Sequence, residues 1–260
     1  TRRTRYSMER YLSLLRVGVT LGEPGRLARL GVTMTHNFRD SSPDEDLEDS
    51  VESVYDTSQL AGFDTVFNTL EFHLNLVVDT RNANARTSSG FAMEAFGGGA
   101  VPIEGFGYWH YGVEASFYVD LYRKTRVLVF RAALEGVDGD SSEIPFVELP
   151  RLGGAYDLRG YVEDRFRDNI AAVASIEYRW PIHEWVAGEV FVDAGRVGRN
   201  YDETFGLDAW KDWRFGFGGG IIVSSRDNVL FRLDVAYGED VTVYFSTDVA
   251  RAFRGREREL

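Results

Sequence analysis

The sequence predicts an all-β protein whose fold is an antiparallel transmembrane β-barrel. Three observations lead to this fold class. Apolar and polar residues alternate with a period of two in about eleven segments, and no helical pattern competes with them. The connections between these segments are short at one end and long at the other, and aromatic residues gather near the segment ends. This combination is typical of outer-membrane barrels.

The alternation defines each expected strand. In the segment FNTLEFHLNLVVD, Leu70, Phe72 and Leu74 share one face, while Glu71 and His73 share the other. The other segments behave in the same way, with one apolar face and one polar, often charged, face. We expect strands over residues 11–21, 27–38, 63–79, 88–100, 107–120, 125–136, 169–180, 184–196, 212–224, 228–238 and 241–253.

The connections divide the predicted barrel into two ends. GEPGR, YRKT, PIHE and SRDN are short, whereas residues 39–62, 137–168 and 198–211 form long loops. Outer-membrane barrels have short turns on the periplasmic side and longer loops outside the cell. The acidic run 40–56 is most simply a solvated loop on that outer side.

A soluble barrel or sandwich is the alternative, because its strands also alternate. Several segments here are longer than the usual soluble strand of about five or six residues, and their polar faces carry charges in mid-strand. Trp180 and Trp185 flank a short turn, while Trp109, Tyr111 and Trp213 lie toward the long loops. Two aromatic girdles of this kind favour the membrane barrel.

Composition narrows the function classes. The 260 residues include 29 basic and 41 acidic ones, a net charge of −12, and this acidity argues against a nucleic-acid partner. There is no cysteine, so disulfides and thiolate metal sites are excluded. No run of 18 apolar residues predicts a membrane-spanning helix, and the first residues lack the pattern of a signal peptide.

One loop carries a recognisable order of motifs. LRGY (158–161) follows two glycines, EYRWPI (177–182) comes in the next strand, and FVDAG (191–195) in the strand after it. VVDTRNANARTSSGF (77–91) and the last two strands, 230–238 and 241–253, add to the pattern. In this order the chain resembles the BamA-type superfamily of outer-membrane insertases and translocators, which includes the bacterial surface antigens, over its barrel portion.

The resemblance implies a loop lock. In the family an Arg-Gly-Phe/Tyr loop folds back into the barrel lumen, and its arginine meets the aspartate of a Phe-x-Asp-x-Gly strand. The long loop 137–168 would fold inward here, and Glu177 on the preceding strand is a second acidic partner. Taken alone, the arginine would be one charge among many in a solvated loop; the resemblance favours the lock. The matching residues are Arg159, Gly160, Tyr161, Phe191, Asp193 and Gly195.

The resemblance also implies a seam and a destination. Tyr244, Phe245 and the closing aromatic Phe253 lie in the terminal strand, where substrate strands would pair. The expected location is the bacterial outer membrane, with a bilayer whose outer leaflet is of the lipopolysaccharide type. Partners would be polypeptide substrates or other subunits of an outer-membrane complex.

Two departures from the family pattern stand out. The family barrel has sixteen strands, so either N-terminal strands precede this stretch or the barrel is a smaller variant, and periplasmic POTRA domains are not visible in the sequence. A short polar tail, residues 254–260, follows Phe253. We expect residues 1–253 to form the barrel domain.

The remaining motifs do not predict an enzyme or a cofactor. The four histidines, His36, His73, His110 and His183, lack metal-ligand spacing. GVDGDSSE (136–143) lacks the full spacing of a calcium loop. The glycines Gly216, Gly218 and Gly220 share the inner face of a predicted strand, where they would make room for the folded-in loop. Insertion or translocation of proteins is the favoured function; a structural anchor within an outer-membrane complex and a passive pore are the alternatives.

Overall fold

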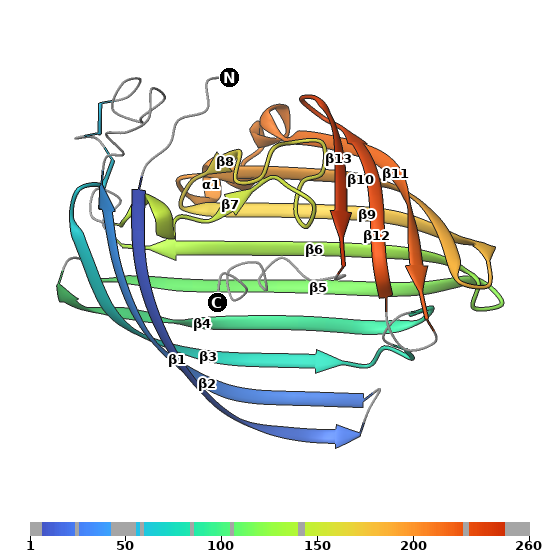
Figure 1. Cartoon of the computed structure of the whole chain (residues 1–260), viewed down its shortest axis with the longest axis horizontal. Helices are drawn as coiled ribbons and strands as arrows, with labels where there is room; N and C mark the ends of the chain where they lie inside the picture. Colours follow the sequence, from blue (N-terminus) through green and yellow to red (C-terminus); the bar gives the residue numbers. More distant parts are fainter. Residues whose placement is uncertain are drawn as a thin grey trace.

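The structure is a strongly curved antiparallel sheet of eleven strands (Figure 1). It is a computed structural model that describes residues 7–23, 26–42, 56–57, 60–83, 86–104, 107–139, 144–225 and 229–247. The strands follow one another in chain order around the sheet. They are β1 (Ser7–Glu23), β2 (Arg26–Ser42), β3 (Val66–Asp79), β4 (Gly90–Glu104), β5 (Tyr108–Tyr122), β6 (Arg126–Asp138), β9 (Ile170–His183), β10 (Val186–Gly198), β11 (Arg214–Ser224), β12 (Val229–Tyr237) and β13 (Val241–Ser246).

The predicted fold class is therefore confirmed, and each expected strand has a counterpart in the sheet. The sheet curls like a barrel wall around a concave inner face, and β1 and β13 are its two edges (Figure 1). Within the described residues these two strands are not paired with each other. The expected strand 241–253 is described only as far as Ser246.

In most strands the side chains alternate between a more buried inner face and an exposed outer face, as the sequence predicts, whereas the edge strand β1 is exposed on both faces along most of its length. In β5 the inner Glu114 and Ser116 are buried, whereas the outer Val113 and Phe117 are exposed. The outer faces of the other strands carry a similar apolar surface. An apolar outer wall and a polar interior are the reverse of a soluble barrel and suit a lipid environment. Among the described residues, no helix is long and apolar enough to cross a membrane.

The sheet has a turn end and a loop end. The connections 123–125 and 184–185 lie at the turn end, while 139–169 and 199–213 lie at the loop end. The turn end also holds the longer connection 80–89 between β3 and β4, which belongs to the segment VVDTRNANARTSSGF (77–91) noted in the sequence. Arg86 from this connection donates to the hydroxyl and the carbonyl oxygen of Ser224 in β11, both at 3.2 Å. Since β11 is not a neighbour of β3 or β4 in the sheet, this contact ties together two separate parts of the wall.

The connection between β6 and β9, residues 139–169, is called the inner loop below. It contains the 3-10 turn η3 (Phe146–Glu148) and a small two-stranded sheet of β7 (Arg151–Leu152) and β8 (Phe166–Arg167). Ile144 and Leu158 in this loop are among the most buried side chains of the described residues. A loop that buries such residues is packed against the protein rather than solvated. The helix α1 (Tyr201–Phe205) and the 3-10 turn η4 (Ala209–Asp212) lie in the next loop.

Some features expected from the sequence lie wholly or partly outside the described residues. Most of the acidic run 40–56, the second half of GVDGDSSE, Phe253 and the tail 254–260 belong to this group. The domain limits 1–253 and 254–260 therefore stay a prediction.

Candidate functional site

The inner loop is attached to the sheet through Arg159. Its guanidinium donates from Nε to Oδ2 and from Nη2 to Oδ1 of Asp193 in β10, both at 2.7 Å, and its backbone N–H donates to Oδ2 at 3.2 Å. The guanidinium also lies over the ring of Phe191, with its carbon 3.3 Å from the ring centroid. Ser175 in β9 completes the contact by donating to Asp193 at 2.5 Å and accepting from Arg159 at 3.2 Å. A planar two-point pair of this kind fixes both position and orientation.

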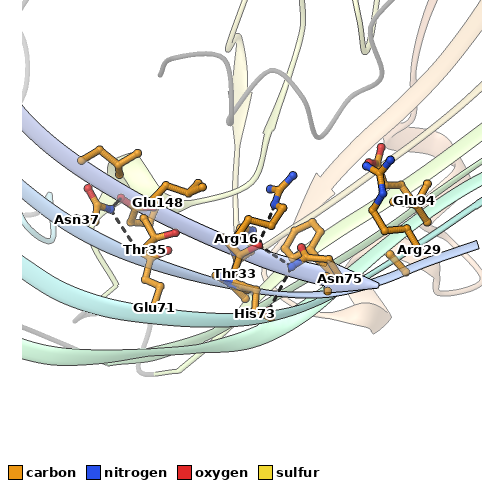
Figure 2. Close-up of a pocket in the computed structure, with 18 of the residues that line it drawn as sticks. Arg16, Arg29, Thr33, Thr35, Asn37, Glu71, His73, Asn75, Glu94 and Glu148 are labelled. Atoms are coloured by element: carbon orange, nitrogen blue, oxygen red, sulfur yellow. Dashed lines mark hydrogen bonds between the residues drawn. The ribbon is translucent and has the colours of Figure 1, made fainter. Parts of the chain in front are cut away.

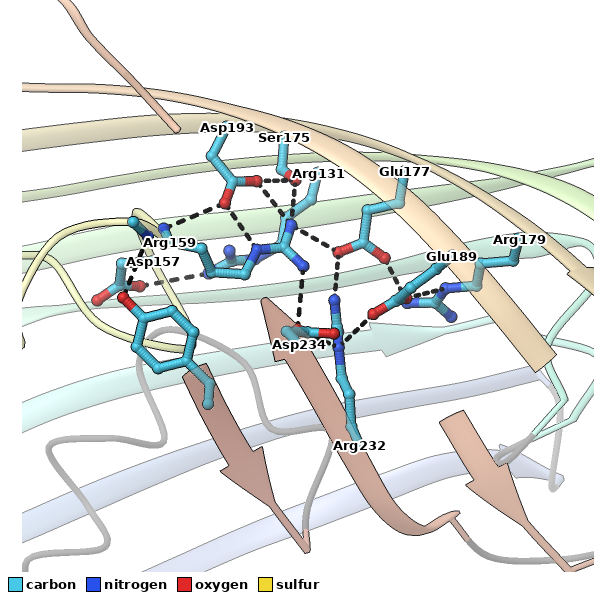
Figure 3. Close-up of polar contacts among 12 residues, drawn as sticks. Arg131, Asp157, Arg159, Ser175, Glu177, Arg179, Glu189, Asp193, Arg232 and Asp234 are labelled. Atoms are coloured by element: carbon cyan, nitrogen blue, oxygen red, sulfur yellow. Dashed lines mark hydrogen bonds and ion pairs between the residues drawn. The ribbon is translucent and has the colours of Figure 1, made fainter. Parts of the chain in front are cut away.

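The arginine belongs to a larger charged cluster on the inner face (Figure 3). Arg159 also approaches Glu177 at 3.0 Å and Asp234 at 3.6 Å. Arg232 in β12 bridges Glu177 at 3.2 Å, Glu189 at 2.6 Å and Asp234 at 2.8 Å, and Arg179 pairs with Glu177 and Glu189. The members of this charged cluster are Arg159, Glu177, Arg179, Glu189, Asp193, Arg232 and Asp234.

Three arginines thus face four carboxylates in a buried place. Burial alone lowers the pKa of the Arg159 guanidinium, but Glu177 and Asp193 more than offset this effect and raise it. Arg159 therefore stays charged. Removal of one partner from such a buried set leaves an uncompensated charge, which is the costly outcome.

Gly160 and Tyr161 attach the same loop to the edge strand β13. The hydroxyl of Tyr244 donates to the carbonyl oxygen of Tyr161 at 2.7 Å and accepts from the backbone N–H of Gly160 at 3.1 Å. Gly160 has a φ of +91°, and a Cβ there would lie 2.5 Å from the backbone N of Gly238. The Tyr161 hydroxyl donates to the carbonyl oxygen of Phe215 at 3.2 Å. The loop tip is therefore bonded to β11 and β13 as well as to β10.

Of the three glycines that the sequence predicted would make room for the loop, Gly216 does so, whereas at Gly218 and Gly220 a Cβ would meet Val235 and Asp234 of β12 instead. A Cβ at Gly216 would overlap the carbonyl oxygen of Arg159, so no other residue fits without moving the loop. At Gly195 a Cβ would lie 3.2 Å from Leu152 and 3.4 Å from Leu158, two apolar residues of the inner loop. Because Gly195 has no side chain, these two leucines can pack directly against the backbone of β10.

Two further contacts hold the inner loop, and sequence reasoning missed both. Glu148 pairs with Arg39 of β2 at 2.9 Å and accepts from Asn37 at 3.3 Å. Asp157 accepts from Arg131 of β6 at 3.4 Å, and Arg131 also donates to Glu114 at 3.0 Å. The loop is consequently fastened to β2 on one side and to β10 and β13 on the other, so it spans the concave face.

A cavity of about 450 Å³ lies beside the loop, on the inner face of β1 to β5 (Figure 2). Most of the residues that line it are of polar types: Asn75 donates to Thr33 at 2.7 Å, Arg16 donates to Thr33 at 3.1 Å, and Asn37 donates to Glu71 at 3.1 Å. His73 and His110 also line it, with ring centroids 5.5 Å apart. Within the described part of the chain, no three His, Cys, Asp or Glu side chains are grouped so as to hold a metal ion.

The three residues predicted for the terminal strand, Tyr244, Phe245 and Phe253, differ in where they lie. Tyr244 faces inward onto the loop, a role that the sequence reasoning did not give it. Phe245 faces outward, is exposed, and stacks on Phe231 with ring centroids 5.7 Å apart. Phe253 lies outside the described residues. A signal for the role of Tyr244 is present in the alternation itself, because residues 242, 244 and 246 share the less exposed face of β13.

Comparison with known proteins agrees with this geometry. The model of the Omp85 superfamily domain matches residues 2–247. The chain belongs to the Omp85 superfamily. This confirms the resemblance drawn from the LRGY loop and the FVDAG strand, and with the fold it indicates an outer-membrane protein.

A solved structure shows the same fold as this Omp85 member. The crystal structure of BamA from Haemophilus ducreyi lacking POTRA domains 1–3 superposes with a TM-score of 0.66 at 16% sequence identity. The match covers 92% of this chain and 53% of the BamA chain, so the Omp85 member spans about half the length of that relative. No curated protein matches the sequence.

Proposed function

We propose that this Omp85 member handles other polypeptides at the bacterial outer membrane, by inserting them into the bilayer or passing them across it. The role is non-enzymatic and needs no cofactor. The observation that carries the proposal is the attachment of the buried inner loop to the edge strand β13 through Tyr244. Membership of the Omp85 superfamily supports the same role.

The edge strand gives this role a physical basis. Among the described residues β13 pairs with β12 alone, so within this part of the chain the backbone N–H and C=O groups on its other side are not paired with a strand. Within a bilayer such groups need a partner, because no water is there to bind them. A polypeptide substrate that adds a strand at this edge satisfies them by β-augmentation. The loop lock, Arg159 with Asp193, holds the loop tip against which β13 is positioned.

Site-specific photo-crosslinking tests the proposal. A photoreactive residue replaces Val243 in β13, and the matched control carries it at Val192 in the interior strand β10. Both side chains are exposed on the outer face, so only the edge distinguishes them. With the full chain in proteoliposomes and a newly synthesised outer-membrane barrel as substrate, we expect adducts at Val243 and few at Val192. Equal or absent adducts at the two positions would contradict the proposal.

A structural anchor in an outer-membrane complex is the second candidate, with subunits rather than substrates as partners. The closely attached inner loop favours it over a passive pore, since a loop fastened to β2, β10 and β13 narrows the lumen. Planar-bilayer conductance separates these two: a pore conducts and an anchor does not. Crosslinked adducts between position 243 and a substrate strand are expected only for the insertion role, so they distinguish it from the anchor and from the pore.

A further inference from the structure

The loop between β10 and β11, residues 199–213, folds outward over the rim of the wall rather than across the lumen. The hydroxyl of Tyr201 donates to that of Tyr111 in β5 at 2.9 Å. Arg196 of β10 donates to the carbonyl oxygen of Ala209 and pairs with Asp212 at 3.1 Å. Tyr111 and Arg196 both belong to the outer face, since their neighbours His110 and Gly195 face inward. The loop is therefore bonded to the outside of the sheet at two places.

The fold of this loop is built into its sequence. Asn200 caps α1 by accepting from the backbone N–H of Glu203 at 2.8 Å, and buried Thr204 donates to the Asn200 carbonyl at 2.8 Å. Gly198 at the end of β10 lets the helix lie close, because a Cβ there would meet the Thr204 hydroxyl at 2.5 Å. Gly136 in β6 leaves space for the ring of Tyr111 in the same way.

This well-packed loop exposes large apolar side chains instead of burying them. Leu207 is 99% exposed and Trp210 is 68% exposed, while Tyr201 and Phe205 are about half exposed and stack with ring centroids 6.3 Å apart. Charged side chains of the loop lie beside these apolar ones. The Lys211 ammonium lies 5.9 Å from the centroid of the Trp210 ring and pairs with Asp208 at 2.6 Å. Aromatic rings beside charged groups are the composition of a membrane–water interface.

We propose that the patch formed by Tyr201, Phe205, Leu207 and Trp210 inserts into the interfacial region of the outer leaflet as a loop-borne membrane anchor. The occupant is the boundary between headgroups and acyl chains, because the patch continues the apolar outer wall. Tyr201 joins it to Tyr111, which lies on the same face of β5 as exposed Trp109, and exposed Phe215, the second residue of β11, also lies on the outer face. A partner protein would not need this continuity with the lipid-facing surface.

Because the chain has no cysteine, a single engineered cysteine can report the depth of the patch. Leu207→Cys carries a bimane fluorophore, and the matched control is Glu163→Cys, an exposed position in the inner loop at the same end of the barrel. Both labelled proteins are reconstituted into vesicles that contain phospholipids with a doxyl group near the headgroup. Iodide in the buffer is the aqueous quencher.

We expect doxyl lipid to quench the label at Leu207 by at least twofold and iodide to quench it weakly, with the reverse at Glu163. Retained heat-modifiable migration on gels shows that both variants are folded. Strong iodide quenching at Leu207 together with no doxyl quenching would overturn the proposal and assign the patch to the aqueous phase, where a protein partner would cover it.

Discussion

Arg159 and Asp193 form a two-point ion pair, 2.7 Å at each contact, in which the aspartate side chain is 0% exposed. The pair joins the tip of the inner loop to β10, a strand that begins after the loop has ended. Replacement of the arginine leaves the Asp193 carboxylate buried beside Glu177 and Asp234 without its main counter-charge.

Arg159→Ala is expected to destabilise the folded barrel by about 3–5 kcal/mol, the cost of an unpaired buried charge. The double variant Arg159→Ala/Asp193→Asn removes both charges and should recover part of that loss, and an Asp193→Arg exchange on the Arg159→Ala background should partly restore the loop. Thermal unfolding and protease cleavage of the inner loop measure both effects. If Arg159→Ala leaves both measurements unchanged, the pair does not hold the loop.

Tyr244→Phe removes only the hydroxyl that joins β13 to the backbone of Gly160 and Tyr161. We expect a loss of roughly 1–3 kcal/mol, because two loop groups lose a partner, and faster hydrogen exchange of the loop tip. The control Phe245→Leu changes the next residue, whose ring faces outward and stacks on Phe231 of β12. Equal exchange at the loop tip in the two variants would show that the hydroxyl does not join the loop to the edge strand.

The strands could be predicted from the sequence because a strand with one apolar face must alternate apolar and polar residues with a period of two. The contact between Arg159 and Asp193 could be predicted because LRGY and FVDAG stand in the same order as in the family. Glu177 could be predicted because it lies on the strand before FVDAG. Glu148 and Asp157 were not accessible, because each is an acidic residue among many, and only the path of the loop in space brings them to Arg39 and Arg131. The contact of Arg86 with Ser224 could not be predicted for the same reason, because the two residues are 138 positions apart in the sequence.

Arg86→Ala should loosen the turn end of the barrel. Arg86 links the β3–β4 connection to Ser224 of β11, and a cavity of about 150 Å³ lies between these elements. Without the guanidinium, we expect the connection to move away from β11 and ion conductance in planar bilayers to rise. Arg126→Ala, an exposed arginine near the same end, is the control and should conduct as the parent does. Parent-like conductance of Arg86→Ala would show that the connection does not restrict the lumen.

Asp157 should make closure of the inner loop depend on pH. Burial raises the pKa of its carboxyl to about 7; Arg131 opposes the rise, while Glu135 and Glu114 add to it. A solvated aspartate has a pKa of about 3.9. The closed loop therefore holds a proton that the open loop releases between about pH 4 and pH 7. This contribution to closure is fully present below about pH 4 and is lost as the pH rises through about 7.

A nitroxide spin label at Ala155→Cys reports loop mobility in the otherwise cysteine-free chain. We expect mobility to increase between pH 5 and pH 8 with a midpoint near 7. In an Asp157→Asn background this response should disappear, because the amide does not titrate in that range. The neighbouring contact between His110 and Glu135, at 2.8 Å, is present in both backgrounds, so the two proteins differ only in the side chain at position 157. An identical pH response in the two backgrounds would assign the titration to another group, and a flat response in both would remove Asp157 as a proton-sensitive contact of the loop.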